Sequence, residues 1–322
     1  MANSLINSNT TFTQAEKNFF IADAMFGLDT LNAGLLYMAS DVKNDQYTFP
    51  KVVSTITLQA FNSIPTSSGS TTLSNKDVTL GKFMGYVEFE PAVFENHWQV
   101  DQISSNLLSR GLPATFENYL ATNYTEQVLQ PVEQMIWMGS TTYSGVTKQN
   151  IKWFDGLVKQ AIVQTALNVP TSAITSANIV NVLELLKNKL PKALLSNANR
   201  YKNLKYVMSV EDAQKYEDAL TTTTFKNNDT TQAGLNRYKG YSIVPVAGLE
   251  PNTIFFGHFD GTVNSNIHMA LTSEANMSFT LDRLQNNSTL YFYKMINKMG
   301  VGIAKPYELA YITDKVIGDF NA

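Results

Sequence analysis

An extended arm is the feature that most limits how this chain can fold. From Val53 to Phe61, hydrophobic and polar side chains alternate with the period of a β-strand. A second extended stretch runs from Val78 to Phe89, and the segment between them, Asn62 to Lys76, is rich in Ser and Thr. We therefore expect two strands joined by a long polar tip that offers little material for a core. Isolated two-stranded hairpins are marginally stable in water, so the arm is expected to lie against another surface.

The longest predicted helix follows this arm and runs from Pro113 to Gly139. Its hydrophobic side chains recur at every fourth residue and form one continuous face. At the usual rise per residue the helix would be roughly 36 Å long. Pro131 lies inside it and predicts a kink, because proline lacks the backbone N–H. The hydrophobic face consists of Phe116, Leu120, Tyr124, Val128, Val132 and Ile136.

Helices and strands alternate along the rest of the chain, which indicates an α+β fold. The first residues, 1–11, are polar and are expected to form an extended arm. Hydrophobic spacing predicts a helix from Thr13 to Met38 and another from Asn178 to Leu190. Ser209 and Asp212 have the spacing of a capping box, which predicts that a helix begins there. The predicted strands are Ile162–Ala166, Leu204–Met208, Tyr241–Val246, Thr253–Phe256, Ala275–Thr280, Leu290–Ile296 and Val301–Ala304.

The composition argues against a dedicated nucleic-acid binder. The net charge is -3, and no basic block of the kind that neutralises phosphates stands out. Only 16% of the residues are charged, against roughly 25% in soluble domains, which suits a surface covered by other subunits. The chain has no Cys, which excludes disulfides, thiolate metal sites and Cys nucleophiles. Without a signal-peptide pattern or a membrane-length hydrophobic run, the protein is expected to be made in the cytoplasm.

The chain shows no catalytic signature, so we expect neither an enzyme nor a cofactor nor a metal. The tract from Gly300 to Lys305 superficially resembles a phosphate-binding loop, but a proline follows it and a strand explains it better. His258 and His268 are the only two histidines close enough in sequence to share a metal ion. The third ligand would have to be Asp260 or Glu274, and ordinary surface or interface histidines are the favoured interpretation.

Several short sequence patterns follow one another in a characteristic order. The long helix ends with an acidic residue, a hydrophobic run and a glycine, and a Gly-Leu step follows it. Later, a glycine precedes a strand that contains a proline, and the next strand contains another glycine. After an arm, an extended hairpin and a long helix, these patterns resemble the major capsid proteins of tailed bacteriophages with the Hong Kong 97 fold. The residues that carry the resemblance are Glu133, Gly139, Gly156, Gly240, Pro245 and Gly257.

The resemblance implies a division of the chain and a mode of assembly. Its segments would be an N-terminal arm and helix (1–45), an extended hairpin loop (46–90), a spine helix and peripheral domain (91–174), an axial domain (175–270) and strands that return to the peripheral domain (271–322). Subunits would form hexamers and pentamers of an icosahedral head that encloses double-stranded DNA without sequence readout. The hairpin would contact a neighbouring subunit through Phe61, Ile64, Pro65, Leu73 and Lys76.

The same resemblance implies partners and a location. Scaffolding, portal and decoration proteins are candidate partners, and no membrane contact is expected. The protein would be located in the virion capsid after assembly in the host cytoplasm. Two alternatives stay open at the level of the sequence. One is an encapsulin-type shell, which uses the same fold, and the other is a Cys-free hydrolase or carbohydrate-binding domain that would use Asp and Glu pairs.

Overall fold

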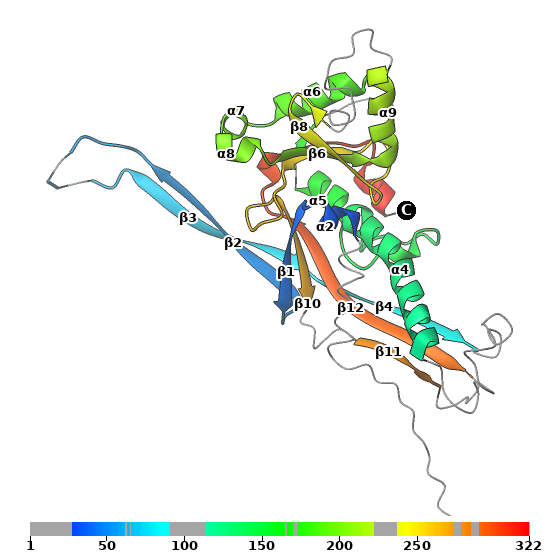
Figure 1. The fold of residues 1–322 in the computed structure, drawn as a ribbon. Coiled ribbons are helices and arrows are strands. Elements are labelled where there is room, and N and C mark those ends of the chain that lie inside the picture. The colour runs from blue at the N-terminus through cyan, green and yellow to red at the C-terminus, as the bar shows by residue number, and fades with distance from the viewer. Residues whose placement is uncertain are drawn as a thin grey trace, which may run out of the picture.

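The fold combines an elongated sheet, a long helix that runs along it, a second sheet with its own helices, and a projecting hairpin (Figure 1). The computed structural model describes residues 28–61, 63–64, 66–90, 114–164, 166–169, 173–221, 237–272, 278–284 and 290–321. The expected arm at 1–11, most of the helix expected from Thr13 to Met38, and Pro65 lie outside the described residues.

The elongated sheet is organised around strand β12 (Tyr291–Ile303). Most of β12 pairs antiparallel with β4 (Gly81–Phe89), and its first half also pairs with β11 (Ser278–Arg283). The last residues of β12 pair with β10 (Ile267–Thr272), which pairs in parallel with β1 (Leu36–Val42). This one strand therefore connects the distal part of the sheet to the part beneath the second sheet.

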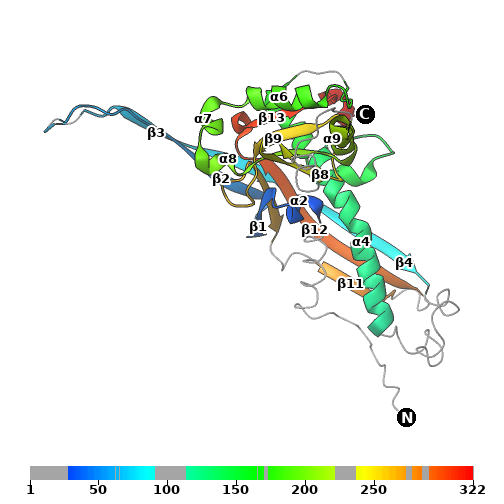
Figure 2. The ribbon, with the colours of Figure 1, turned by 45° about the horizontal axis from the view of Figure 1, so that its top comes forward.

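Helix α4 (Ala114–Met138) is the long helix that the sequence predicted, and it lies along the elongated sheet (Figure 2). Leu120 is 5% exposed and belongs to a core cluster with aromatic residues of β12. One and a half helical turns before its end, Val132 begins a run that joins the main core, where Ile136 and Trp137 are fully buried. The predicted hydrophobic face is therefore confirmed over the described part of the helix, which continues through Pro131.

The second sheet has the strand order β5-β13-β9-β6-β8-β7. Its central strand β6 (Leu204–Ser209) pairs antiparallel with β9 (Ile254–His258) and in parallel with β8 (Tyr241–Val246). Two short strands, β5 (Leu167–Asn168) and β7 (Arg237–Tyr238), lie at the edges. Strand β13 (Leu309–Ile312) returns from the C-terminal part of the chain to pair with β9 and β5.

Four helices accompany this second sheet. Helix α6 buries a stripe at helical spacing, as its sequence predicted. The Ser209 hydroxyl accepts the N–H of Asp212 at 3.0 Å and donates to its carboxylate at 2.9 Å, so the predicted cap is confirmed. The helices are α6 (Ile179–Lys189), α7 (Lys192–Leu195), α8 (Ala198–Tyr201) and α9 (Val210–Thr221). Shorter turns elsewhere are α2 (Asp29–Asn32), η2 (Gln149–Ile151), η5 (Pro306–Glu308) and η6 (Ile317–Phe320).

The hairpin differs from the prediction in both strands, because the first runs from Gln46 to Ile56 and stops short of Phe61. Strand β2 (Gln46–Ile56) pairs with β3 (Gly69–Thr79), from Gln46 opposite Thr79 to Ile56 opposite Gly69. The predicted partner, Val78–Phe89, instead contains β4, which belongs to the elongated sheet. The segment read as a polar tip is therefore largely a strand, because Ser and Thr side chains bond across the hairpin and support pairing without a core.

Three further predictions are wrong. The helix expected to reach Met38 ends earlier, because Gly34 has a φ of 60° and the chain then enters β1. The strand expected at Ile162–Ala166 is mostly helix α5 (Leu157–Val163), which buries Leu157, Val158 and Ala161 at helical spacing. The two strands expected at 290–296 and 301–304 form the single strand β12, since Gly300 stays within the ladder opposite Ala270.

Candidate assembly surfaces

The outer half of the hairpin exposes hydrophobic side chains that its own chain leaves uncovered. Figure 1 shows β2 and β3 projecting away from the body as a two-stranded ribbon. Phe61 is 100% exposed and Leu58 93%, and Ile56, Ile64 and Leu73 are also largely exposed. Burying a hydrophobic side chain of this size is favourable by a free energy of about 1.5–3 kcal/mol. We call these five residues the hairpin patch.

Polar pairs hold the two strands of the hairpin together. Ser54 lies 3.1 Å from Thr71 between hydroxyl oxygens, and Thr55 lies 3.0 Å from Ser70. Backbone pairing continues past the ladder, since the N–H of Thr57 donates to the carbonyl of Ser68 at 2.9 Å. The hairpin patch is therefore carried by a paired ribbon.

The root of the hairpin is anchored on the body. Phe49 and Val78 are 9% and 3% exposed and form a small core cluster with Ala304. A Cβ atom on Gly302 of β12 would overlap a methyl group of Val78, and one on Gly300 would overlap the carbonyl of Thr79. The glycines that resembled a phosphate loop thus give β3 room to cross β12. Lys76, expected at the hairpin contact, lies at this root and donates to the Gln164 side chain.

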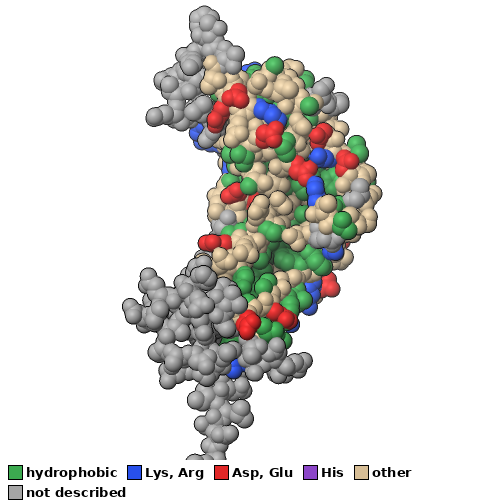
Figure 3. All heavy atoms as spheres, turned by 90° about the vertical axis from the view of Figure 1, so that its right-hand side faces the viewer, with side chains coloured by type: hydrophobic (Ala, Val, Ile, Leu, Met, Phe, Trp, Pro, Cys, Tyr) green, Lys and Arg blue, Asp and Glu red, His purple; other side chains and the backbone are tan. Residues whose placement is uncertain are grey.

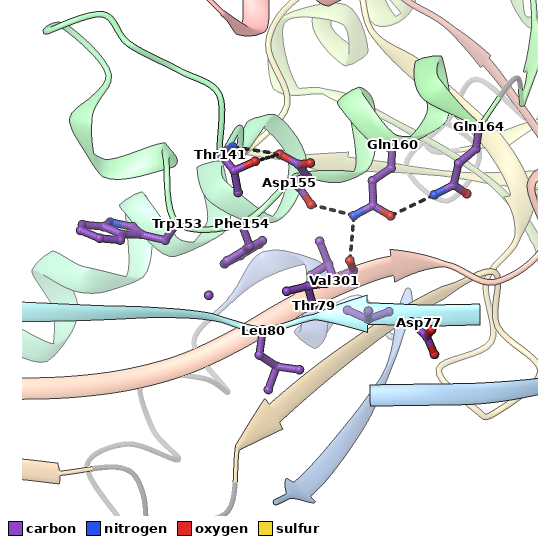
Figure 4. Close-up of a pocket in the computed structure, with 12 residues that line it drawn as sticks. Asp77, Thr79, Leu80, Thr141, Trp153, Phe154, Asp155, Gln160, Gln164 and Val301 are labelled. Carbon is purple, nitrogen blue, oxygen red and sulfur yellow. Dashed lines mark hydrogen bonds between the residues drawn. The ribbon is translucent and has the colours of Figure 1, made fainter. Parts of the chain in front are cut away.

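A recess of about 340 Å³ opens beside this root, between β3, β4 and α5 (Figure 4). The Gln160 amide donates to the carbonyls of Asp155 and Val301, both at 2.7 Å, and so ties α5 to β12. Burial opposes ionisation of Asp155, but hydrogen bonds from Lys159 and Thr141 outweigh it and hold the pKa of Asp155 below its ordinary value. Of the residues that line the recess, Gln164 reaches the hairpin, because its side-chain oxygen accepts a hydrogen bond from Lys76 of β3.

The outer face of the elongated sheet is a second hydrophobic surface, which the sequence reading missed. On β4, Phe83 and Phe89 face the core, whereas Met84 and Tyr86 are 54% and 45% exposed. The ring of Tyr86 lies 5.9 Å from that of Phe292 on β12. Figure 3 shows hydrophobic side chains gathered in a hollow below the body that the second sheet forms. The signal was present in the sequence, because both faces of the strand at 81–89 carry large hydrophobic residues.

Glu133 forms buried hydrogen bonds near the end of α4. It is 5% exposed, and its carboxylate accepts hydrogen bonds from the backbone and hydroxyl of Thr30. The Trp137 indole N–H donates to the Thr30 hydroxyl at 2.8 Å. Burial raises the pKa of Glu133, against the lowering effect of these hydrogen bonds. The predicted acidic position at the helix end therefore joins α4 to α2 inside the core.

Gly139 and Gly156 bring the end of α4 against the start of α5. The N–H of Gly156 donates to the carbonyl of Gly139 at 2.8 Å. A Cβ atom on Gly139 would overlap the carbonyls of Phe154 and Met135, and one on Gly156 would overlap the N–H of Gly139. The sequence-predicted pair thus has one structural role, which is close backbone contact.

His258 and His268 contribute to packing. His258 and His268 are both 3% exposed, and burial lowers the pKa of each below the ordinary value. The His268 ring lies 4.8 Å from that of Phe49 at the hairpin root. No group of three or more His, Cys, Asp or Glu side chains is placed to hold a metal ion among the described residues, and Glu274 lies outside them. Within the same residues, no helix is long and apolar enough to cross a bilayer.

Comparisons with known proteins give a match in structure. No family model and no curated protein matches the sequence. A chain of the satellite phage P4 procapsid, whose structure includes a size determination protein, has a TM-score of 0.59 at 7% identity, over 94% of this chain and 92% of that chain. The capsid of the native GTA particle gives 0.56 at 12% identity, covering 89% and 90%, and Gordonia phage Cozz gives 0.56 at 11%, covering 89% and 86%. The chain has a Hong Kong 97-like capsid fold.

Within this capsid fold, the remaining predicted positions shape the second sheet. Gly240 has a φ of 87° in the turn between β7 and β8, where a side chain would be strained. Pro245 lies opposite Met208, on the part of β8 beyond the two-residue strand β7, so its missing N–H breaks no bond to that strand. A Cβ atom on Gly257 would lie 2.8 Å from the Leu309 side chain.

Proposed function

We propose that this protein is the major capsid protein of a tailed bacteriophage, a structural protein without catalytic activity. Subunits associate into hexamers and pentamers of an icosahedral head that encloses double-stranded DNA. The observation that carries the proposal is the hairpin patch on a Hong Kong 97-like capsid fold: a paired ribbon, anchored at its root, that presents large hydrophobic side chains away from its own core.

The hairpin patch stabilises the shell by covering hydrophobic surface on a neighbouring subunit. Buried hydrophobic area contributes about 25 cal/mol per Å², and the same contact recurs at every subunit of a shell. The exposed face of the elongated sheet, with Met84 and Tyr86, offers matching hydrophobic area on the neighbour. A contact that is weak in one subunit can therefore stabilise the shell, because it is repeated at every subunit.

We assign the regions of the capsid fold as follows. The second sheet and its helices, largely residues 175–270 joined by β13, form the axial region near the rotation axes. Helix α4 and the elongated sheet form the peripheral region. Glu133, Gly139 and Gly156 hold the end of α4 against α2 and α5, whereas Phe61, Ile64 and Leu73 contact the neighbour. In this assignment Lys76 acts within its own subunit.

DNA is enclosed without sequence readout in this proposal. The net charge of -3 gives the inner wall little general attraction for phosphates. Scaffolding, portal and decoration proteins complete the particle, whose place of assembly is the host cytoplasm and whose final location is the virion.

The test separates folding from assembly by shortening the hairpin. Thr57 and Ser68 are already hydrogen-bonded at 2.9 Å, so a short Gly-Ser turn can replace residues 58–67 and leave β2 and β3 paired. Circular dichroism and thermal melting should match the parent, and electron microscopy should show no closed shells. Ser63→Gly with Ser67→Gly is the matched control, which alters the same loop but keeps its hydrophobic residues and should assemble. Normal shells from the shortened chain would contradict the proposal.

A further inference from the structure

One end of the second-sheet body is strongly basic. From Lys187 to Lys205 the chain carries six basic residues and no acidic residue, spread over the end of α6, α7, α8 and the start of β6. Some of these charges are used internally: Arg200 bonds to Glu308 at 2.6 Å, and Lys187 bonds to Glu184 at 3.1 Å. We call the exposed members Lys189, Lys192 and Lys202 the basic end.

Within the described part of the chain, the members of the basic end make no ion pair. Lys189, Lys192 and Lys202 are exposed, and none forms an ion pair with any described residue. Lys205, by contrast, is half-buried and donates to the backbone carbonyl of Ala33 at 3.3 Å. The uncompensated positive charge therefore points into solvent or toward a partner.

The opposite end of the same body is acidic. Helix α9 carries four acidic residues and a single basic residue, Lys215. Lys215 bonds to Glu211 at 2.9 Å and to the buried Asp212 at 3.0 Å. Glu217 and Asp218 remain exposed on the last turns of the helix, and we call them the acidic end. Arg237 lies beside α9, where its carbonyl accepts a hydrogen bond from the Tyr216 hydroxyl. With Arg237 included, the described residues of this end still carry more acidic than basic side chains.

The two ends face away from each other. Figures 1 and 2 both place α7 and α8 on the side toward which the hairpin projects, and α9 on the other side. Figure 3 views the α9 side and shows acidic side chains spread over the upper body, with Lys and Arg side chains among them. Surfaces of opposite charge at the two ends of one subunit favour head-to-tail contact between copies. Such contacts close into a ring when the rotation from one subunit to the next allows it.

We propose that the basic end of one subunit binds the acidic end of the next copy of this chain around a ring. The proposal rests on the ring-forming function proposed above and adds the surfaces and their direction. Like charges meet if a subunit is inserted in the reverse orientation, so the contact also sets the direction of insertion. The α9 surface offers the basic end a partner of matched charge on the same molecule, which favours a second copy over a polyanion such as DNA.

The experiment uses two charge-reversed chains. In the first, Lys192→Glu and Lys202→Glu make both ends acidic; in the second, Glu217→Lys and Asp218→Lys make both ends basic. Basic residues suit the C-terminal turn of α9, so the second chain should fold well. Each chain alone should need a concentration at least about tenfold higher than the parent to form rings, measured by sedimentation velocity. A chain with all four substitutions carries both ends reversed and should assemble like the parent.

An equal mixture of the two reversed chains gives the sharpest result. Alternating subunits close a ring of six but not a ring of five, so native mass spectrometry should find hexamers and no pentamers. If each reversed chain assembles like the parent, the proposal is overturned although the shell function stands. If ring formation is unchanged and only DNA retention falls, the basic end binds nucleic acid and the proposal is also overturned. If the parent itself forms no rings, the shell function fails first.

Discussion

Val78, at the root of the hairpin, packs its side chain into the space that a Cβ atom of Gly302 would occupy on β12. The end of β3 crosses the elongated sheet at this point, and Val78 is 3% exposed there. The direction in which the hairpin leaves the body therefore depends on a missing side chain in a different strand. A shell that uses the hairpin as its contact depends on the same position.

Gly302→Ala should weaken this root. The added methyl group forces Val78 to move, and overpacking of this kind costs about 1–3 kcal/mol. The free energy of unfolding, from chemical denaturation, should fall by that amount, and assembled shells should be fewer. Gly85→Ala on β4 is the matched control, because no atom lies within 4 Å of its added Cβ. In a Val78→Ala background the cost of Gly302→Ala should shrink, and equal costs in both backgrounds would contradict the contact.

Val132→Asp should produce insoluble or unfolded protein. Val132 is 3% exposed on the core face of α4, and an unpaired buried carboxylate costs several kcal/mol. Val128 is half-buried, so Val128→Asp should lower the melting temperature less. Gln130→Asp, at an exposed position of the same helix, is the control and should fold normally. Equal melting temperatures for all three variants would show that the face assignment is wrong.

Glu133 should make stability depend on pH. Burial raises its pKa in the folded protein, so the folded state holds the proton more tightly than the unfolded state. This contribution is fully present below the ordinary pKa of a glutamate and is lost as the pH rises through the raised value. Comparing thermal melts between pH 4 and pH 8, about the range in which a raised carboxyl titrates, the parent should lose stability relative to Glu133→Gln. Parallel curves for the two proteins would contradict the buried carboxyl.

The sequence predicted the elements whose structure is determined by residues close to one another in the chain. The face of α4 was readable because Leu120, Val132 and Ile136 recur at helical spacing and all are buried. The cap at Ser209 and Asp212 was readable because both partners lie within one helical turn. The exposure of Phe61 and Ile64 also followed, since nothing in the surrounding polar segment could cover them.

Elements that depend on contacts between residues far apart in the sequence could not be predicted in the same way. The pairing of β2 with β3 depends on register across the hairpin, and the strand period alone also fitted Val78–Phe89. The role of Gly302 could not be predicted from the sequence, because the residue that needs the space, Val78, lies more than two hundred positions earlier. The strand at Leu36–Val42 likewise exists because it pairs with β10. The charged ends were obscured by the hydrophobic residues between the lysines.

Electron microscopy of the purified protein, over a range of concentration and salt, tests the central claim most directly. Closed shells, with hexamers and pentamers as their building units, are the expected result. The part of their stability that comes from the contact between the basic end and the acidic end should weaken as added salt shortens the screening length from about 10 Å at 0.1 M to about 3 Å at 1 M. A protein that stays monomeric at every concentration and salt level would contradict the account.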